Sequence, residues 1–494
     1  MRLSILLKAL ISIPAQADRE ISRLVLDSRR IQAGDLFFAI RGASSDGRQY
    51  INDALAKGAV AVLVEAERAG EITYQNGIPL IPIQDLKSQI GVLASCFYDH
   101  PAKKLRMTGV TGTNGKTSIT HFIAQGLGEP CGVIGTLGSG LYGSLGEAGL
   151  TTPDAISLHD MLHHFVQQGV KTVAMEVSSH SIDQGRVNGI EFEMGIFTNL
   201  TQDHLDYHGT MEAYAAVKRR FLAELPTQHV IINGDDSYGQ RWIEELAHHK
   251  SVFAYATQPV EVRVPRVYAD KIQTSLQGIK AKVHSPWGEG ELVIPLIGRF
   301  NLSNVLAVLT VLCFYGIPFE EVLRRLSRLK PTPGRMQTIT GPGMPLVVVD
   351  YSHTPDSLEK ALEALRAHAT GKLFCVFGCG GNRDAGKRPI MAKIAERLAD
   401  RVIVTNDNPR HEKPEDIAQQ IMRGFSRPEL ISVVLDRSKA IENSIQWANA
   451  NDCILIAGKG AEHYQQVGDE KIHFDDVEEA DKCIAEKMNV TVVK

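Results

Sequence analysis

A glycine-rich segment in the first quarter of the chain has the residues needed to hold a nucleotide. The run from Gly109 to Ser118, GVTGTNGKTS, follows an apolar strand-like run and precedes a helical pattern, ITHFIAQGL. In such a loop the backbone N–H groups close around phosphate oxygens, Lys116 supplies positive charge, and the Thr117 hydroxyl can bind Mg²⁺. Five residues separate Gly109 from Gly115, where the common pattern has four. We predict an ATP-binding loop, with a simple glycine turn before a helix as the alternative.

Polar residues after the next strand-like runs could complete a phosphoryl-transfer site. Glu176 lies near the end of the run KTVAMEV, His204 follows the run EMGIFTN, and Lys218 lies in the helical pattern MEAYAAVKRRFL. Hard cations such as Mg²⁺ prefer oxygen ligands, with occasional imidazole. We therefore predict one Mg²⁺ site that includes Thr117 and Glu176, and a second that includes His204. Each residue alone would more often be a capping or solvent-facing group, but their recurrence beside a glycine-rich loop favours the functional interpretation.

Three α/β units are expected to position these residues, because 494 residues are too many for one ordinary core. The first, residues 1–86, alternates helical runs with strand-like runs at 36–40, 59–65 and 78–83. The second, residues 87–332, opens with a helix and contains the glycine-rich loop. Its expected strands are at 104–110, 171–177, 193–199 and 229–233. The proline-rich run LKPTPGR is a plausible hinge into the third unit, residues 333–494.

The third unit has the clearest β-α-β pattern. Its strand-like runs are at 345–350, 372–378, 401–406, 431–436 and 453–458, and helical patterns separate them. This spacing predicts a Rossmann-like unit with a parallel sheet. Four of the strands lead into polar loops, DYSHTPD, GCGGNRD, NDNPRH and GKGAEH. Because ligands bind beyond the carboxyl ends of strands in open α/β sheets, we expect these loops to share one rim.

Composition excludes several classes of protein. The net charge of −4 gives no global attraction to nucleic acid or to an anionic membrane, so any anionic substrate must be held by local basic groups. Seven scattered cysteines without paired spacing indicate a reducing compartment and no zinc site. The start, MRLSILLKALISIPAQAD, is similar to a secretory signal, but Lys8 interrupts the apolar run. We instead expect a short amphipathic helix with Leu6 and Leu10 packed inward, and a cytoplasmic, monomeric protein without a membrane span.

The motifs together resemble the Mur ligase family. The shared runs occur in the family's order over almost the whole chain: TGTNGKTS, MEVSSHSIDQGRV, TNLTQDHLDYHG, GRFNLSN, PTPGRMQ, VDYSHTPD, GCGGNRDAGKRP and GKGAE. The resemblance implies a three-domain α/β protein. Its first domain would bind the UDP end of a precursor, its central domain, with a mainly parallel sheet, would be the ATPase, and its C-terminal Rossmann-like domain would bring the incoming amino acid.

The resemblance also implies roles for single residues. Residues matching UDP-sugar contacts are Leu26, Ser28, Ala43, Ser44 and Ser45, and the last three lie in a loop whose side chains vary within the family. Residues matching those that hold the muramoyl-dipeptide are Thr151, Thr152, Ser178, Gln184 and Arg186. Nucleotide contacts would come from Gly112, Thr113, Asn114, Gly115, Lys116, Thr117, Ser118, Asn301, Arg335 and Asp350. Lys218 matches the lysine that the family carbamylates, which turns a cation into an oxygen ligand for the second Mg²⁺.

Three of these matches have ordinary alternatives. Asn301 could be a helix cap, Arg335 a surface ion pair, and Asp350 a turn former. The order of the motifs favours the adenine, terminal-phosphate and ribose contacts, respectively. The resemblance makes Lys116, His204, Lys218 and Arg335 the expected catalytic residues.

The loop DNPR predicts which amino acid is added. Asp407, Asn408, Pro409 and Arg410 match family members that take meso-diaminopimelate, whereas the L-lysine enzymes lack the arginine. Diaminopimelate is lysine with an extra carboxylate, which a guanidinium can bind by two charge-assisted hydrogen bonds while Asp407 pairs with the distal ammonium. L-Lysine would leave that guanidinium unpaired. A proline-terminated turn is the alternative interpretation. The remaining matches to amino-acid contacts are Arg383, Gly458 and Glu462.

The resemblance therefore implies an ADP-forming, amide-bond-forming ligase with ATP and Mg²⁺. It would add meso-diaminopimelate to UDP-N-acetylmuramoyl-L-alanyl-D-glutamate through an acyl phosphate. One rival is another amino-acid ligase with the same ATPase core, such as a folylpolyglutamate synthetase, which the DNPR, EVSSH and LDSR runs disfavour. A nucleotide-switched regulatory protein is a second rival. A dinucleotide oxidoreductase is disfavoured because no G-x-G-x-x-G is present.

Overall fold

The computed structural model describes residues 1–42, 45–68, 70–147 and 149–492, with side chains described as far as Met488. The chain forms two compact units that alternate along the sequence. The first unit comprises Met1–Thr111, Glu129–Gly195 and Val217–His229, and the second comprises Gly112–Gly128, Ile196–Ala216 and Val230–Lys494. Among the described residues, no helix combines the length and the hydropathy that crossing a membrane requires.

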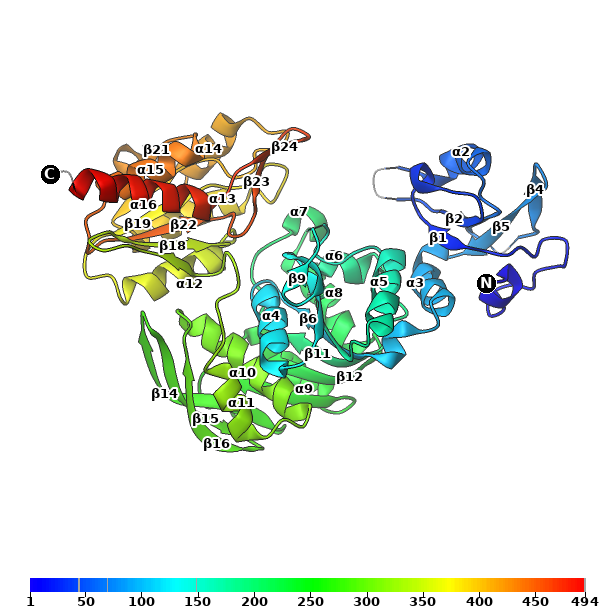
Figure 1. Cartoon of the computed structure of the whole chain (residues 1–494), viewed down its shortest axis with the longest axis horizontal. Coiled ribbons are helices and arrows are strands. Elements are labelled where there is room, and N and C mark those ends of the chain that lie inside the picture. The colour runs from blue at the N-terminus through cyan, green and yellow to red at the C-terminus, as the bar shows by residue number, and fades with distance from the viewer. Residues whose placement is uncertain (43–44, 69, 148, 493–494) are drawn as a thin grey trace. The chain divides into compact units, whose positions relative to one another are not determined.

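The N-terminal part of the first unit is a five-stranded sheet in the order β1-β2-β3-β5-β4, drawn in blue in Figure 1. Its strands are β1 (Arg23–Val25), β2 (Asp35–Ala39), β3 (Ala61–Ala66), β4 (Thr73–Gln75) and β5 (Ile78–Gln84). Side chains alternate between the two faces of a strand. Leu36 and Phe38 therefore pack with helix α3 (Leu86–Phe97), and Phe37 and Ala39 pack with helix α2 (Ile51–Ala56). The three predicted strands of this region are confirmed as β2, β3 and β5.

The N-terminal helix is shorter than the sequence pattern predicts. Helix α1 spans Leu3–Leu6, and turns follow it. Leu6 is 3% exposed, as predicted, but Leu10 is 37% exposed, so the prediction that Leu10 packs inward is wrong. Because the helix ends at Leu6, Leu10 does not lie one turn further along the same helical face. Leu3 and Leu7 fill this part of the core instead.

The largest sheet has eleven strands in the order β16-β15-β14-β13-β12-β11-β6-β10-β7-β8-β9. Its strands are β6 (Arg106–Thr111), β7 (Cys131–Gly135), β8 (Gly138–Leu141), β9 (Ser144–Leu145), β10 (Thr172–Glu176), β11 (Phe192–Phe197), β12 (Thr227–Asn233), β13 (Ser251–Ala256), β14 (Arg266–Ser275), β15 (Gly278–Ser285) and β16 (Gly288–Ile294). The predicted strands β6, β10, β11 and β12 are confirmed. β10 pairs in parallel with both β6 and β7, whereas β14, β15 and β16 form an antiparallel meander.

The C-terminal sheet belongs to the second unit and has the order β17-β18-β22-β19-β20-β21. Its strands are β17 (Gln337–Ile339), β18 (Leu346–Asp350), β19 (Leu373–Phe377), β20 (Arg401–Val404), β21 (Ser432–Val433) and β22 (Cys453–Ala457). All neighbours pair in parallel except β17, which is antiparallel to β18. The predicted parallel sheet is therefore confirmed, although the run at 431–436 forms a strand of only two residues.

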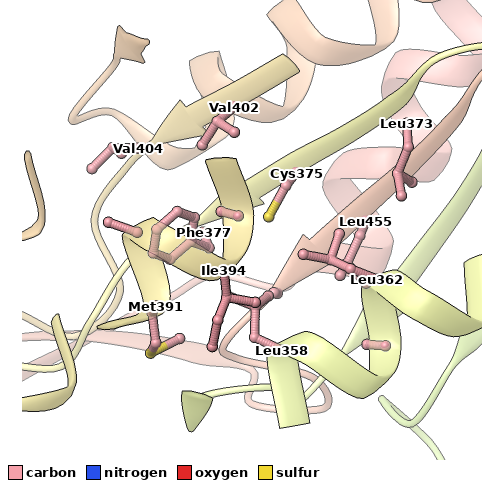
Figure 2. Packing of buried hydrophobic residues seen from close by; sticks show 14 of the residues in the cluster. Leu358, Leu362, Leu373, Cys375, Phe377, Met391, Ile394, Val402, Val404 and Leu455 are labelled. Carbon is pink, nitrogen blue, oxygen red and sulfur yellow. The ribbon is translucent and has the colours of Figure 1, made fainter. Parts of the chain in front are cut away.

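Helices cover both faces of this parallel sheet, which explains the continuous apolar runs of its strands. Helices α12 (Pro355–Arg366), α13 (Lys387–Leu398) and α14 (Pro414–Met422) pack on one face. Figure 2 shows this layer, in which Leu358, Met391 and Ile394 from the helices surround Cys375 and Phe377 from β19. Helices α15 (Arg437–Trp447) and α16 (Asp476–Val492) pack on the opposite face, against residues such as Phe374 and Val376.

Candidate active site

The glycine-rich loop lies between strand β6 and helix α4 (Lys116–Leu127), as the sequence predicts. Gly112 and Gly115 have φ angles of +143° and +90°, which L side chains rarely adopt. The loop is also crowded, because a Cβ at Gly115 would lie 2.6 Å from Asn304 Oδ1. Glycine is therefore required at both positions for steric and conformational reasons. The first N–H groups of α4 follow immediately, at a helix end suited to anions.

Lys116 and Thr117 begin helix α4 and are already held in place. Lys116 Nζ donates to the carbonyl oxygens of Gly112 at 3.0 Å and Thr113 at 2.7 Å, so the ammonium group lies inside the loop. Arg335 Nη2 donates to Thr117 Oγ1 at 3.2 Å, and its guanidinium lies 4.4 Å from the centre of the Tyr351 ring. The structure thus places Arg335, predicted from a motif more than 200 residues away, at the phosphate loop.

A cavity of ≈ 610 Å³ in the second unit opens beside this loop. Among its lining residues are Asn114, Gly115, Ser118, Arg335 and Asp350, which the sequence predicted as nucleotide contacts. Cavities of this size accommodate drug-sized ligands and cofactors. The cavity is therefore large enough to receive a nucleotide next to the phosphate loop.

Asp350 and Asn301 are both buried beside this region, but in different ways. The Asp350 carboxylate accepts from Met336 N at 2.8 Å and from the Ser352 hydroxyl. Burial raises the pKa of the Asp350 carboxyl above its ordinary value, although Arg335 acts in the opposite direction. Asn301 is not among the described residues that line the large cavity. It lines a neighbouring one of ≈ 80 Å³ and donates to Ile297 O at 2.8 Å.

The structure adds cavity residues that the sequence did not predict. Asn114 Nδ2 donates to Asp356 Oδ2 at 2.9 Å, and Lys360 lies 2.9 Å from the same carboxylate. Asn304 donates to Asn301 Oδ1 at 3.2 Å and lines the large cavity. Asp356 and Asn304 belong to the runs VDYSHTPD and GRFNLSN, so the motifs were noticed but these members were not singled out.

The four predicted metal-binding residues are divided between the two compact units. Thr117 and His204 belong to the second unit, and Glu176 and Lys218 belong to the first. Glu176 is 1% exposed, and its carboxylate accepts from the backbone N and the hydroxyl of Thr136, at 2.8 and 3.2 Å. Lys218, on helix α8 (Met211–Ala223), is also 1% exposed. Among the described residues, no group of three or more His, Cys, Asp or Glu side chains is arranged to hold a metal.

His204 is oriented by the neighbouring Asp203. His204 has a left-handed backbone, with φ +56°, and its Nε2 lies 3.4 Å from Asp203 Oδ2. Burial alone would raise the pKa of the Asp203 carboxyl, but a hydrogen bond from His353 and the charges of His204 and Lys387 hold it well below its ordinary value. An ionised Asp203 therefore faces all three basic side chains.

The residues predicted to hold the muramoyl-dipeptide form one network in the first unit. Thr152 Oγ1 donates to Glu176 O at 2.7 Å and accepts from Ser178 N at 3.2 Å. Arg186 Nη1 donates to Thr152 O at 2.8 Å, and Arg186 Nε donates to Gln184 Oε1 at 3.0 Å. Thr151 joins the network through Thr136, whose Oγ1 lies 3.3 Å from that of Thr151. The structure therefore brings together all five residues and Glu176.

A second cavity, of ≈ 700 Å³, lies in the N-terminal part of the first unit. Leu26, Ser28 and Ser45 line it, as predicted for UDP-sugar contacts. Ala43 and Ser44, predicted for the same role, lie outside the described residues. Tyr50 and Asp53 also line the cavity and were not predicted.

The four polar loops at the C-terminal sheet share one rim, as predicted. Asn408 Nδ2 donates to Glu462 Oε2 at 2.8 Å, and Lys459 Nζ donates to Asn408 Oδ1 at 3.1 Å. Arg410 Nη1 donates to Gly381 O at 2.9 Å. Tyr351 OH donates to Glu462 Oε1 at 3.4 Å, which connects the loop after β18 to the others.

The rim concentrates charges of both signs. Burial disfavours ionisation of Asp407, but Lys459 and Arg437 outweigh it and keep the pKa of its carboxyl below the ordinary value. Gly458 allows this close packing, because a Cβ there would lie 2.6 Å from Asp407 Oδ2. Arg383 is exposed on the neighbouring loop, and Pro409 packs against Gly381. Carboxylates and guanidinium groups side by side suit a zwitterionic small molecule.

The fold and these sites define a class: an α/β nucleotide-binding protein with a phosphate loop and a separate charged site for a small molecule. The chain belongs to the Mur ligase family. Three models of that family match, "Mur ligase family, catalytic domain" at residues 20–98, "Mur ligase middle domain" at 110–312 and "Mur ligase, glutamate ligase domain" at 334–460. The predicted three-domain, mixed α/β fold with mainly parallel sheets is thereby confirmed.

Two similar proteins and one solved structure carry the same name. The chain is 50% identical to the UDP-N-acetylmuramoyl-L-alanyl-D-glutamate–2,6-diaminopimelate ligase of Coxiella burnetii, over 95% of this chain and 96% of that one. It is 47% identical to the protein of the same name from Pseudomonas putida, with the same coverage. A solved structure of a ligase with this name covers 99% of this chain and 100% of its own, with 34% identity and a TM-score of 0.70.

Proposed function

We propose that the chain is an ATP-dependent ligase that adds meso-2,6-diaminopimelate to the D-glutamate of UDP-N-acetylmuramoyl-L-alanyl-D-glutamate, in peptidoglycan precursor synthesis. The names of relatives that cover 95% of the chain support the substrates. The observation that carries the proposal is the rim of the C-terminal sheet. There Asp407, Arg410 and Glu462 lie on adjoining loops, in the same compact unit as the phosphate loop.

The chemistry joins a carboxylate to an amine in two steps. The terminal phosphoryl group of ATP passes to the D-glutamate carboxylate, which gives an acyl phosphate and ADP. The amine of diaminopimelate then attacks the carbonyl carbon, loses a proton, and displaces inorganic phosphate from the tetrahedral intermediate. Lys116 and Arg335 would neutralise the charge on the transferring group, which is the main contribution a protein makes to phosphoryl transfer. Their positions at the loop support this role.

Mg²⁺ belongs to the proposal because the available ligands suit a hard cation. The Thr117 hydroxyl and the buried Glu176 carboxylate are oxygen donors. His204 and Lys218, the latter as its carbamate, would hold a second ion. When bound, Mg²⁺ would offset the negative charge of the phosphates.

The precursor would be held by the first unit. The cavity lined by Leu26, Ser28 and Ser45 would receive the UDP-sugar end, together with Ala43 and Ser44. The network of Thr151, Thr152, Ser178, Gln184 and Arg186 would hold the dipeptide. We propose domains at 1–86, 87–332 and 333–494. The family matches at 20–98, 110–312 and 334–460 support three parts, and the first match extends past residue 86.

Diaminopimelate would bind at the rim of the C-terminal sheet. Arg410 and Arg383 would bind its carboxylates, and Asp407 would pair with the distal ammonium, while Asn408, Pro409, Gly458 and Glu462 complete the site. His204 and His353 are both candidates for taking the proton from the attacking amine. We further propose a cytoplasmic monomer without nucleic acid or membrane as partner. All seven cysteines are free thiols, which supports a reducing compartment.

The proposal is tested by supplying UDP-N-acetylmuramoyl-L-alanyl-D-glutamate and Mg-ATP with either meso-diaminopimelate or L-lysine. Phosphate release and the new amide product should both depend on meso-diaminopimelate. The Arg410→Ala variant should lose much of this preference while its KM for ATP stays within about two-fold, because Arg410 lies outside the nucleotide cavity. Equal turnover of both amino acids by the wild type would reject the specificity, and no product with either would reject the ligase.

A further inference from the structure

The amino-acid-binding loop has an unusual backbone at its key residue. Arg410 has φ +51°, in the left-handed region that residues other than glycine seldom occupy. Such a conformation persists only where the surrounding structure holds it. The part of the chain that fixes the Arg410 backbone therefore also fixes the direction of its guanidinium.

The supporting element is a two-stranded hairpin that no sequence motif singled out. Strands β23 (Tyr464–Val467) and β24 (Glu470–His473) pair antiparallel and form a separate sheet. The turn between them contains Gly468, with φ +60°. The Tyr464 ring anchors the hairpin, with Lys459 Nζ and Lys471 Nζ at 5.5 and 4.2 Å from its centre.

Main-chain hydrogen bonds attach this hairpin to Arg410 on both sides. Arg410 N donates to Gln466 O at 3.1 Å, and Gly468 N donates to Arg410 O at 2.7 Å. Arg410 and Val467 consequently form a parallel β-bridge. Both backbone polar groups of Arg410 are thus satisfied by the hairpin, and the left-handed conformation is fixed from outside the loop.

The hairpin also fixes the two residues that precede Pro409. Gln465 Nε2 donates to Asp407 O at 2.7 Å, and Gln466 N donates to Asn408 Oδ1 at 2.9 Å. Asn408 is 1% exposed, and its amide is completed by Lys459 and Glu462 at 3.1 and 2.8 Å. Every polar residue of the DNPR loop therefore has a hydrogen bond to the hairpin.

We infer that the β23–β24 hairpin sets the amino-acid specificity. Gln465 is the positioning residue: it holds Asp407 and, through the loop, orients the Arg410 guanidinium for a substrate with two carboxylates. This inference rests on the proposed function, because it names the part of the chain that orders the same site. Gln466 contacts Asn408 and Arg410 through its backbone, and its side-chain amide donates to Gly468 O at 3.1 Å within the hairpin. Gln465 acts through its side-chain amide, which makes it the residue to test.

The test is the Gln465→Met variant of the full chain, which keeps the side-chain length but removes the donor to Asp407 O. The kcat/KM for meso-diaminopimelate should fall about ten-fold, mainly through KM, while the kcat/KM for L-lysine and the KM for ATP stay within about two-fold. The matched control is Gln419→Met, at an exposed position on α14, which should match the wild type. A purely structural role would lower both kcat/KM values together.

A second variant acts on the same DNPR loop from the turn of the hairpin. In Gly468→Ala the added Cβ has no heavy atom within 4 Å, so it causes no steric clash. Its effect comes from the positive φ, which alanine adopts less readily, and reaches Arg410 through the hydrogen bond from Gly468 N to Arg410 O. It should lower the same diaminopimelate-to-lysine ratio. An unchanged ratio in both folded variants would overturn the inference. A wild type that makes no product with diaminopimelate would instead refute the proposed function, so the two failures are distinguishable.

Discussion

Single residues around the phosphate loop are held by neighbours in positions that suit phosphate binding. Lys116 Nζ is held by two loop carbonyls, and the Arg335 guanidinium is fixed between Thr117 and the Tyr351 ring. A cation that is ordered before the nucleotide arrives loses less conformational entropy on binding. Preorganised charge of this kind is also what accelerates phosphoryl transfer. The arrangement therefore supports both affinity and rate.

Another single residue, the buried His159, makes the free energy of unfolding depend on pH. Its side chain is 0% exposed on helix α5 (Ala155–Gln167), and burial lowers its pKa from 6.5 to about 4. The folded state therefore keeps this imidazole neutral, while the unfolded chain takes up a proton below about pH 6.5. Stability from this residue is complete above pH 6.5 and is lost as the pH falls towards 4, by roughly 3 kcal/mol at most.

We therefore expect His159→Leu to flatten the fall of the free energy of unfolding between pH 6.5 and about 4, even if the variant is less stable at pH 7. Urea unfolding at several pH values measures this slope. The exposed His248 provides a control, since His248→Leu should leave the slope unchanged. A His159→Leu slope equal to that of the wild type would show that the histidine is not the source.

Sequence motifs predicted residues that carry charge at strand ends and in the glycine-rich loop. The structure places Arg335 at Thr117 and Asp350 in the lining of the same cavity. Tyr351 and Asn304 were not predicted, because their contributions come from a ring face and a side-chain amide that only tertiary packing brings to the site. The residue type at a motif position indicates what chemistry the side chain can do. A residue that only supports such a side chain by packing or hydrogen bonding cannot be recognised from one sequence.

At the scale of elements, a buried ion pair ties helices α15 and α16 to the rim of the C-terminal sheet. Arg437 makes two hydrogen bonds of 2.7 Å to Asp476, and both side chains are 0% exposed. The same guanidinium donates to Asn406 O at 3.1 Å and to Ala457 O at 3.0 Å, at the ends of β20 and β22. Arg437 therefore holds two helices and two strand ends together.

Removing one partner of this pair should be costly. Asp476→Ala leaves a buried guanidinium without its carboxylate, and we expect the free energy of unfolding of the cooperative step that reports this domain to fall by about 3–5 kcal/mol. Urea unfolding monitored by hydrogen exchange of β22 provides the measurement. Asp481→Ala, at an exposed position on the same helix, should change it by less than about 0.5 kcal/mol. A loss below about 1 kcal/mol for Asp476→Ala would contradict this account.

Strands and helices were predictable from the sequence where their burial gives a regular hydrophobic pattern. Strands β18, β19, β20 and β22 are covered by helices on both faces, so their sequences are continuous apolar runs. The meander β14–β16 has partly exposed, mixed sequences and was not predicted, and β1 and β4 are only three residues long. The hairpin β23–β24 has no buried residue, so no hydrophobic period marks it. Its contacts with the DNPR loop are hydrogen bonds, which leave no mark in the hydrophobic pattern.

At the scale of the whole molecule, the compact units do not follow the order of the sequence. Residues 112–128, which include helix α4 and the phosphate loop from Gly112 onward, belong to the second unit, although the residues on either side belong to the first. A prediction of domain boundaries from linkers and hinges assigns neighbouring segments to the same unit. It therefore cannot find a unit made of separate segments. Long-range contacts, such as the bond from Asn114 to Asp356, determine it.

This division predicts two separate ligand footprints. Under the proposed function, the nucleotide of Mg-ADP binds in the cavity of the second unit, and UDP binds in the N-terminal cavity of the first. Mg-ADP at about 100 times its Kd should stabilise the folded state that binds it by about 2.7 kcal/mol. Hydrogen exchange should therefore slow at residues 112–118 and 350–357 with Mg-ADP, and at residues 26–29 and 47–53 with UDP. Each ligand should leave the other's segment unchanged, because the two cavities share no residue.

Lys116→Ala separates specific binding from general stabilisation in this experiment. The variant loses the ammonium group held inside the phosphate loop, so Mg-ADP should no longer protect residues 112–118 at the same concentration, whereas UDP should still protect residues 26–29. Protection of both segments by either ligand alone would mean that the units respond as one body. Protection by Mg-ADP that survives in Lys116→Ala would place the nucleotide elsewhere. Only the combination of one lost footprint and one retained footprint agrees with two sites in two units.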